Sequence, residues 1–275
     1  MRLQCELCFH HCKLEEGQVG LCKARGNRNG AIVSLNYGKI TSMALDPVEK
    51  KPLCRFRPGS QILSVASFGC NLKCPFCQNH HISMAGEGER ETVDIYPESL
   101  AEQAAALVYR GNIGVAYTYN EPLIGYEYVL DCAQAVRRRG LVNVLVTNGT
   151  IEERPWRALL KWIDACNIDL KGFSREWYRK LGGDLDCVKR SIQIAVEQCH
   201  VEVTTLLVTG MNDSEEEIRS LSRWLAGIDR QIPLHLTRFV PRFQMRDTEP
   251  TPLGRLHRLV EIARENLDYV YPGNC

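Results

Sequence analysis

The sequence lacks the features that mark membrane proteins, nucleic-acid-binding proteins and secreted proteins. No run approaches the roughly 20 consecutive apolar residues that span a bilayer, and Met1–Gln4 does not begin a charged segment followed by an apolar signal core. Lysine and arginine number 34 against 33 acidic residues, so a formal net charge of +1 supplies no field to gather nucleic acid or an anionic membrane. We therefore expect a soluble, cytoplasmic protein with no membrane and no nucleic acid among its partners.

Cysteine, in contrast, is abundant, with 13 in a chain of 275 residues. Disulfide bonds do not persist in a reducing compartment, so clustered cysteines there indicate metal sites. Cys70, Cys74 and Cys77 have the spacing C-x3-C-x2-C directly after an apolar run. Because iron–sulfur clusters are usually held by four thiolates, this trio would leave one iron of a [4Fe–4S] cluster open to another ligand. A structural zinc site or three free thiols is the alternative, but zinc favours paired C-x2-C motifs.

From Ile62 onward, short β-branched runs alternate with longer amphipathic stretches, which is the pattern of βα units. Six runs are predicted to be parallel strands: Ile62–Ser67, Gly114–Tyr119, Val142–Thr147, Ala165–Leu170, Val201–Val208 and Pro233–Thr237. Helices are predicted to begin at Pro97, Pro122, Ser214 and Leu253. The predicted fold class is α/β: a partial (β/α)6 TIM-like barrel over residues 59–275, preceded by a small cysteine-rich extension over residues 1–58.

Polar residues recur where successive predicted strands end, which is where parallel barrels collect their catalytic groups. After the cysteine loop they are Asn120 and Glu121, Asn148, Asp169 and Lys171, and His235. On the fourth strand, the period of two puts Asn167, Asp169 and Lys171 on one face. A charged pair there either forms a buried salt bridge near the rim or meets a polar ligand. The shared position of these residues is more informative than any one of them.

The predicted extension carries a second group of cysteines, with the spacing C-x2-C-x3-C-x9-C: Cys5, Cys8, Cys12 and Cys22. A closed four-thiolate site suits either structural zinc or an auxiliary iron–sulfur cluster, and both stay open. Zinc would fasten a glycine-rich segment too short for its own core, whereas a cluster would relay electrons toward the cysteine trio. His10 and His11 are alternative ligands, although adjacent side chains rarely both reach one metal.

Taken together, these motifs resemble the radical S-adenosylmethionine (SAM) enzymes, and among them the activating enzymes of glycyl-radical enzymes such as pyruvate formate-lyase. The resemblance rests on the cysteine trio with Phe76, on Asn-Glu-Pro where relatives have Gly-Gly-Glu-Pro, on Thr-Asn-Gly and on Asp-Leu-Lys. Within that superfamily the chain is most similar, over nearly its whole length, to the radical SAM component of the AmmeMemoRadiSam system. That similarity is carried by Cys5–Cys8, Asp46–Leu53, Cys77–His81 and Tyr271–Asn274.

The resemblance implies an oxidoreductase with a [4Fe–4S] cluster on the cysteine trio and SAM on its open iron. An electron from a donor such as flavodoxin or ferredoxin would cleave SAM into methionine and a 5′-deoxyadenosyl radical, which abstracts hydrogen from an unknown substrate. That substrate would be a glycyl-radical partner, another peptide or a small molecule, and the cluster suggests an anaerobic setting. The competing hypothesis is an iron–sulfur redox sensor or metal-stabilised scaffold. A sensor, however, has no use for Glu121, Asp169 and Lys171 at the strand ends.

The resemblance also assigns SAM contacts. They are Phe76 for the adenine, Asn120 and Glu121 for the methionyl amine, Asn148 for the ribose or methionine portion, Asp169 and Lys171 for the carboxylate, and His235 for the ribose. Two departures from the activating enzymes stand out: Tyr119 replaces the first glycine of Gly-Gly-Glu-Pro, and Val146 replaces a frequent aspartate before Thr-Asn-Gly. We expect the first to reshape the amine pocket. The second is expected to weaken a monovalent-cation site near Asp169.

Overall fold

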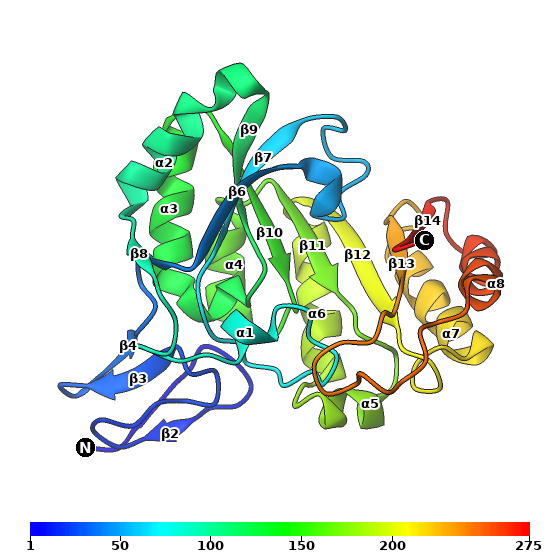
Figure 1. The fold of residues 1–275 in the computed structure, drawn as a ribbon, viewed down its shortest axis with the longest axis horizontal. Coiled ribbons are helices and arrows are strands. Elements are labelled where there is room, and N and C mark those ends of the chain that lie inside the picture. Colours follow the sequence, from blue (N-terminus) through cyan, green and yellow to red (C-terminus); the bar gives the residue numbers. More distant parts are fainter.

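The computed structural model describes residues 1–275 and is organised around one eight-stranded sheet (Figure 1). The strand order is β14-β13-β12-β11-β10-β9-β7-β6. In chain order these strands are β6 (Ser42–Pro47), β7 (Gln61–Ala66), β9 (Asn112–Tyr117), β10 (Val142–Thr147), β11 (Ala165–Asp169), β12 (His200–Leu207), β13 (Leu234–Arg238) and β14 (Val270–Gly273). Neighbours from β7 to β14 are parallel, and β6 pairs antiparallel with β7. Because β6 and β14 are the unpaired edges, the barrel is open.

The predicted α/β partial barrel is confirmed, and all six predicted strands are present as β7, β9, β10, β11, β12 and β13. The structure adds the two edge strands, β6 and β14, which the sequence did not reveal. Both contain proline, Pro47 in β6 and Pro272 in β14. Proline argues against a strand in the sequence, yet an edge strand tolerates it because one side of its backbone needs no partner.

Helices pack against the outer face of the sheet (Figure 1). The longer ones are α2 (Pro97–Ala106), α3 (Tyr126–Arg138), α4 (Glu153–Leu160), α6 (Leu185–Val196), α7 (Glu215–Ala226) and α8 (Leu253–Arg264). The shorter ones are α1 (His80–Ser83), α5 (Arg175–Lys180) and the 3-10 turns η1 (Val48–Lys50), η2 (Val108–Arg110) and η3 (Pro122–Gly125). Three predicted helix starts agree, and Ser214 accepts a bond from the Glu217 amide at the start of α7. At Pro122 the chain forms the 3-10 turn η3, and the α-helix begins later, at Tyr126. No helix combines the length and apolar character needed to cross a membrane.

Alternation along the strands separates two packed faces. Val65 and Tyr117 point outward into the main core under the helices, whereas Ala116 and Val144 belong to an inner apolar cluster. The segment that contains η1 lies on this inner side, where Val48 and Leu53 are fully buried in the same cluster. The chain between β6 and β7 therefore fills part of the inner face of its own barrel.

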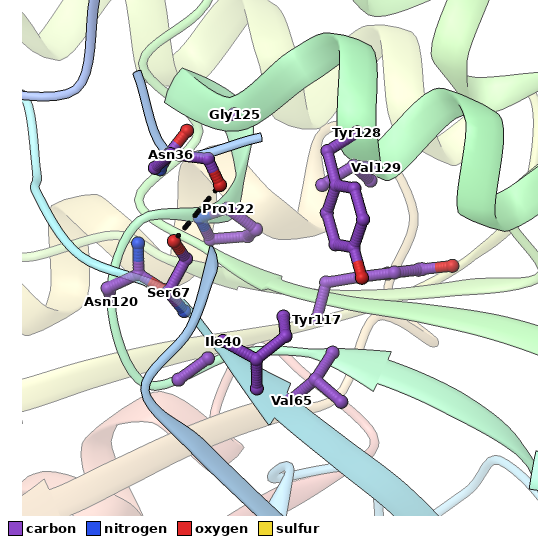
Figure 2. A pocket seen from close by; sticks show the side chains of 11 residues that line it. Asn36, Ile40, Val65, Ser67, Tyr117, Asn120, Pro122, Gly125, Tyr128 and Val129 are labelled. Carbon is purple, nitrogen blue, oxygen red and sulfur yellow. Dashed lines mark hydrogen bonds between the residues drawn. The ribbon is translucent and has the colours of Figure 1, made fainter. Parts of the chain in front are cut away.

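A small pocket lies between the sheet and α3 on the outer side (Figure 2). Val65 and Tyr117 from the strands and Tyr128 and Val129 from α3 line it. These four side chains belong to the main outer core, so the sheet separates this pocket from the inner face. Ser67 and Asn120, at the start of the cysteine loop, also line it.

The amino-terminal residues form small antiparallel pairs beside the barrel: β1 (Leu3–Gln4) with β2 (Lys13–Leu14), β3 (Arg25–Arg28) with β4 (Ala31–Ser34), and β5 (Lys39–Ile40) with β8 (Val93–Asp94). In Figure 1, β2 and β3 lie at the lower left, below α1, whereas β8 lies higher, at the left of the barrel. Strand β6 of this part joins the main sheet. The proposed division at residue 58 stays a prediction, and β6, which precedes residue 58, is part of the main sheet.

Candidate functional site

The three cysteines of the C-x3-C-x2-C motif lie on the loop between β7 and α1, and Asn120 fixes the start of that loop. Asn120 Oδ1 accepts a hydrogen bond from the Ser67 amide at 3.0 Å. Its Nδ2 donates to the carbonyls of Phe68 and Gly69, each at 3.2 Å. A single amide side chain from the end of β9 therefore positions the entry to the cysteine loop at the end of β7.

Position 69 of the cysteine loop accepts only glycine. Its φ of +88° lies in the left-handed region, and a Cβ there would approach the carbonyl oxygen of Cys22 to 2.5 Å. No side chain fits at that distance, because the neighbouring atom is rigid backbone. The cysteine loop consequently lies directly against the amino-terminal segment.

Two of the three thiols of the loop have polar neighbours within hydrogen-bond distance. Cys70 Sγ accepts from the Leu72 amide at 3.4 Å and from Asn148 Nδ2 at 3.7 Å, and Cys77 Sγ lies 3.1 Å from Ser83 Oγ. Burial raises the pKa of Cys70 well above its ordinary value. Burial also raises the pKa of Cys74 to about 11, an effect partly opposed by the positive charge of Lys171.

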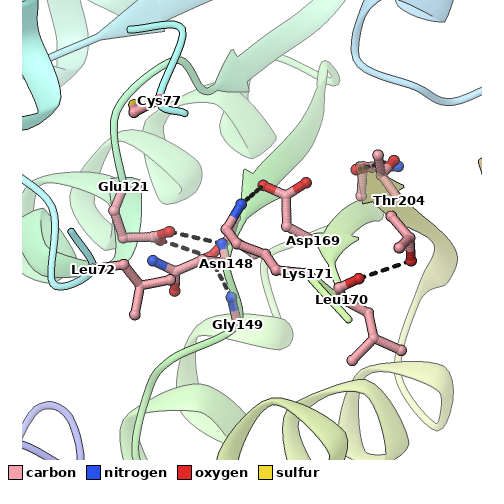
Figure 3. A network of polar contacts seen from close by, with 12 residues as sticks. Leu72, Cys77, Glu121, Asn148, Gly149, Asp169, Leu170, Lys171 and Thr204 are labelled. Atoms are coloured by element: carbon pink, nitrogen blue, oxygen red, sulfur yellow. Dashed lines mark hydrogen bonds and ion pairs between the residues drawn. The ribbon is translucent and has the colours of Figure 1, made fainter. Parts of the chain in front are cut away.

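Glu121 joins the ends of β9 and β10 beside this loop (Figure 3). Its carboxylate accepts hydrogen bonds from Thr147 Oγ1 at 2.6 Å, from the Asn148 amide at 2.7 Å and from the Leu123 amide at 3.0 Å. Burial raises its pKa to about 7, although these hydrogen bonds act to lower it. The side chain is therefore held in one orientation by three donors.

Asp169 and Lys171 form the salt bridge that the sequence left as one of two alternatives. Lys171 Nζ lies 2.9 Å from Asp169 Oδ2, and Figure 3 shows the pair beside Asn148. The Lys171 backbone is fixed on both sides, because its amide donates to the Tyr178 hydroxyl at 3.0 Å and its carbonyl accepts from Trp177 Nε1 at 2.8 Å. Burial acts to lower the pKa of Lys171, but the charges of Asp169 and Cys74 raise it above its ordinary value. The cysteine loop thus has a permanent cation beside it.

A second polar group, formed by Tyr119, Asp46 and Lys51, lies on the inner face. Tyr119 has a φ of +72°, unusual for a residue other than glycine, at the position where activating enzymes have glycine. Its hydroxyl donates to Asp46 Oδ2 at 2.5 Å, and Lys51 Nζ binds the same oxygen at 2.8 Å. Burial acts to raise the pKa of Asp46, but these two hydrogen bonds bring it down to about 2. The Asp46–Leu53 run and the replaced glycine were the available signals.

Family comparison agrees with this geometry. The sequence profile of the Radical SAM superfamily matches residues 64–225, which is more than half of the chain. The matched range includes the cysteine trio, Glu121 and the Asp169–Lys171 pair. The chain belongs to the radical SAM superfamily.

Three relatives show how far this radical SAM protein is similar to others. An uncharacterized protein of Methanocaldococcus jannaschii is 37% identical over 284 residues, covering 99% of this chain and 81% of that protein. A second protein of that organism, provisionally named a glycyl-radical enzyme activating enzyme, is 24% identical and covers 74% of this chain and 85% of that protein. Streptococcus suis SuiB bound to precursor peptide SuiA shares the fold, with a TM-score of 0.59, 16% identity, and coverage of 75% of this chain and 47% of that chain.

The cysteine loop fits the [4Fe–4S] cluster that membership of the radical SAM superfamily implies. Three thiolates on one loop are the ligand set that leaves one iron of such a cluster open. The two donors at Cys70 and the cation near Cys74 suit thiolate ligands that carry negative charge.

The other predicted SAM contacts differ in how free they are. Phe76 packs against Trp177, with ring centroids 5.9 Å apart. Asn148 uses both ends of its amide, donating to Asn71 Oδ1 at 2.9 Å and accepting from the Thr150 amide at 2.8 Å. Lys171 and Asp169 are each held by one side-chain partner, the other member of the pair. The SAM contacts of Phe76 and Asn148 stay predictions.

His235 lies nearer the start of its strand than the other predicted site residues of this radical SAM protein. It is the second residue of β13, on the inner face, and its Nε2 is 2.6 Å from Glu202 Oε2. The same carboxylate is 2.9 Å from His200 Nε2 and accepts the Arg55 amide at 2.8 Å. The predicted contact of His235 with the ribose stays untested, and the residue holds the inner face together through Glu202. Glu202 itself gave no motif signal in the sequence.

Proposed function

We propose that this radical SAM protein holds a [4Fe–4S] cluster on Cys70, Cys74 and Cys77, cleaves SAM reductively, and takes a hydrogen atom from a protein or peptide substrate. The observation that carries the proposal is the meeting of one three-cysteine loop with polar strand ends. Asn148 reaches Cys70 Sγ from the end of β10, and the charge of Lys171 acts on Cys74 from the end of β11. A protein that only sensed redox state would need the loop without these strand-end residues.

When bound, the cluster supplies one electron to the sulfonium of SAM, which yields methionine and a 5′-deoxyadenosyl radical. The chain's own residues bind and orient. Lys171 offers a charge-assisted partner for the SAM carboxylate in place of Asp169. Glu121, fixed by three donors, keeps the ends of β9 and β10 at a constant separation. A one-electron donor such as flavodoxin or ferredoxin is expected to supply the electron.

The substrate class rests on the relatives. One is named as an activating enzyme of a glycyl-radical enzyme, and one was solved with a precursor peptide. In both cases the other molecule is a polypeptide. We therefore propose a polypeptide substrate for this chain, with activation of a glycyl-radical enzyme as the first candidate.

The cleavage step has a direct test. The protein is loaded with iron and sulfide without oxygen, reduced, and given SAM, and 5′-deoxyadenosine and methionine are quantified. We expect both products from the unmodified chain, their loss in Cys70→Ala, and their retention in Cys54→Ala, which removes a thiol outside the motif. A fully loaded chain that forms no 5′-deoxyadenosine would leave the redox-sensor hypothesis.

The substrate class has a separate test. A candidate glycyl-radical enzyme is prepared with deuterated glycine, and deuterium in 5′-deoxyadenosine is measured by mass spectrometry. Transfer of deuterium together with a protein-based radical signal supports activation of a glycyl-radical enzyme. Transfer only from a short deuterated peptide would contradict that candidate and favour peptide modification.

A further inference from the structure

The four amino-terminal cysteines surround one cavity, although they come from two separate loops. Cys5, Cys8 and Cys12 lie on the loop between β1 and β2, which is closed by a bond from the Cys5 amide to the Cys12 carbonyl at 2.9 Å. Cys22 lies on a turn closed by the bond from the Gly20 amide to the Arg25 carbonyl at 2.8 Å. All four cysteines line the same cavity.

The two loops are in contact beside this cavity, and the barrel completes its wall. A Cβ on Gly20 would lie 3.6 Å from Cys12 Sγ, so the turn packs against the first loop. Asn71 of the cysteine loop and Ile124 of η3 supply the remaining side. The cavity therefore lies at the boundary between the amino-terminal segment and the predicted SAM site.

Arg25 provides a second, independent observation at this cavity. The residue lines it, is only 7% exposed, and its Nε has no hydrogen-bond partner. Its other two nitrogens are occupied, because Nη1 and Nη2 bind the Glu127 carboxylate at 2.7 and 2.8 Å. A buried N–H without a partner costs about 1–3 kcal/mol. An anionic group in the cavity would remove that cost.

The position of the cavity favours a cluster over a structural zinc ion. The Cys22 carbonyl accepts the Cys70 amide at 3.2 Å, so a redox-active group in the cavity would lie directly beside the cysteine loop. His10 also lines the cavity, where its Nε2 is 2.8 Å from the Asn71 carbonyl, and His11 lies 3.4 Å from Glu6 and from Glu152. The thiols are left as the ligand set.

We propose that Cys5, Cys8, Cys12 and Cys22 hold an iron–sulfur cluster, with Arg25 as its buried cationic neighbour. A cluster held by four thiolates is anionic, which is the charge that the Arg25 Nε–H would meet. Structural zinc is the competing occupant and is an outcome of the test below.

The position of this cluster gives it a role that rests on the proposed function. The Cys70 amide donates to the Cys22 carbonyl at 3.2 Å, so a ligand of one cluster is hydrogen-bonded to a ligand of the other. With both clusters bound, one electron from an external low-potential donor protein would reduce the amino-terminal cluster. The same electron would then pass to the cluster on Cys70, Cys74 and Cys77, which would return the amino-terminal cluster to its oxidised state.

The metal site is tested independently of SAM cleavage in the full chain carrying Cys70→Ala, Cys74→Ala and Cys77→Ala. The variant is loaded with iron and sulfide without oxygen, and iron, acid-labile sulfide and zinc are quantified. We expect iron and sulfide in equal amounts and a cluster signal in electron paramagnetic resonance after reduction. Zinc without iron, or no bound metal in a folded variant, would overturn the proposal. Because this variant cannot assemble the SAM site, its result does not depend on the proposed function.

The reciprocal variant replaces Cys5, Cys8, Cys12 and Cys22 with serine and keeps the other trio. We expect it to lose the amino-terminal signal while the second cluster still forms and, under strong chemical reduction, still cleaves SAM. Reduction by the donor protein should become slower by at least tenfold. Unchanged reduction by that protein would overturn the relay. Loss of both clusters in a variant with native circular dichroism would overturn the idea of two separate sites.

Arg25 is tested by a pair of substitutions in the Cys70, Cys74 and Cys77 triple variant. Arg25→Gln removes the cation and should lower the reduction potential of the amino-terminal cluster. Glu127→Gln leaves the cation without its carboxylate partner and should raise that potential. A purely structural role for the ion pair predicts no opposite shifts. Equal potentials in both variants would contradict the assignment of Arg25.

Discussion

The hydroxyl of Tyr119 donates a 2.5 Å hydrogen bond to Asp46 across the inner face of the barrel. Tyr119 follows the end of β9, whereas Asp46 is paired with Ile62 near the start of β7. The ring therefore extends from the rim toward the opposite end of the strands. Tyr119 thereby connects the segment predicted to contact SAM to the end of β6.

Two substitutions at Tyr119 separate this contact from the strain of its backbone. Tyr119→Phe keeps the φ of +72° and removes the hydroxyl, so we expect a loss of about 1–2 kcal/mol in the free energy of unfolding. Tyr119→Gly also loses the ring, but it relieves backbone strain worth about 1 kcal/mol. Chemical denaturation measures both. An unchanged Tyr119→Phe variant would contradict a structural role for the hydroxyl.

Glu202 is expected to shape the acid stability of the protein. Burial acts to raise its pKa, but hydrogen bonds from His200 and His235 lower it from 4.5 to about 2. A carboxyl group whose folded-state pKa is depressed contributes stability that is complete above pH 4.5 and is lost as pH falls toward 2. Glu202→Gln should therefore be less stable at pH 7 by about 3 kcal/mol. The difference from the unmodified chain should shrink below pH 4.5, as thermal unfolding across pH can show.

Gly69→Ala is expected to disrupt the cysteine loop. The added methyl group would lie 2.5 Å from the Cys22 carbonyl oxygen, and the alanine would need a φ of +88°. Gly88→Ala is the matched control, because its φ of +75° imposes similar strain with no atom within 4 Å of the added group. We expect iron binding to fall by more than half in Gly69→Ala only. An equal loss of iron in the two variants would show that the shared backbone strain, rather than the close approach to Cys22, disrupts the loop.

Substitution of Lys171 should weaken SAM affinity, whereas substitution of Asp169 should not. Lys171→Met removes the cation proposed for the SAM carboxylate and should weaken SAM binding to the oxidised, cluster-loaded protein about tenfold, equivalent to about 1.4 kcal/mol. Asp169→Asn releases Lys171 from its salt bridge and should leave SAM affinity equal or increased. Equilibrium dialysis with labelled SAM measures both variants. Weaker binding in both would indicate that the intact pair, not the cation alone, contacts SAM.

The barrel could be predicted from the sequence because its central strands are buried on both faces. Runs such as Val142–Thr147 are continuous and β-branched, and each ends in a polar residue that the topology brings to the same rim. The residues that follow or end these strands, including Glu121 and Asp169, were therefore identifiable before any coordinates. Edge strands carry no such signal, and β14 with Pro272 was missed for that reason.

Partners distant in sequence could not be predicted, because a motif describes neighbours along the chain. Glu202 meets His235 from the adjacent strand, 33 residues away, and Arg25 meets Glu127 across 102 residues. Tyr119 was recognised as a departure, but its direction depends on a side-chain rotamer that no local pattern encodes. The sequence thus predicted which residues reach the rim more reliably than which side chains they contact there.

The segment from Val48 to Arg55 has a consequence for how a polypeptide substrate would enter. Its apolar side chains pack against the inner face, and its backbone amides at Cys54 and Arg55 are bound by Glu202 at 3.1 and 2.8 Å. Val48 packs in one cluster with Ile62, the second residue of β7, and Glu202 is the third residue of β12, so the segment crosses the inner face near the starts of these strands. For the polypeptide substrate proposed above, we expect entry from the opposite end, where the strands finish and the cysteine loop lies. The part of the substrate that reaches the radical would then enter and leave through the same opening.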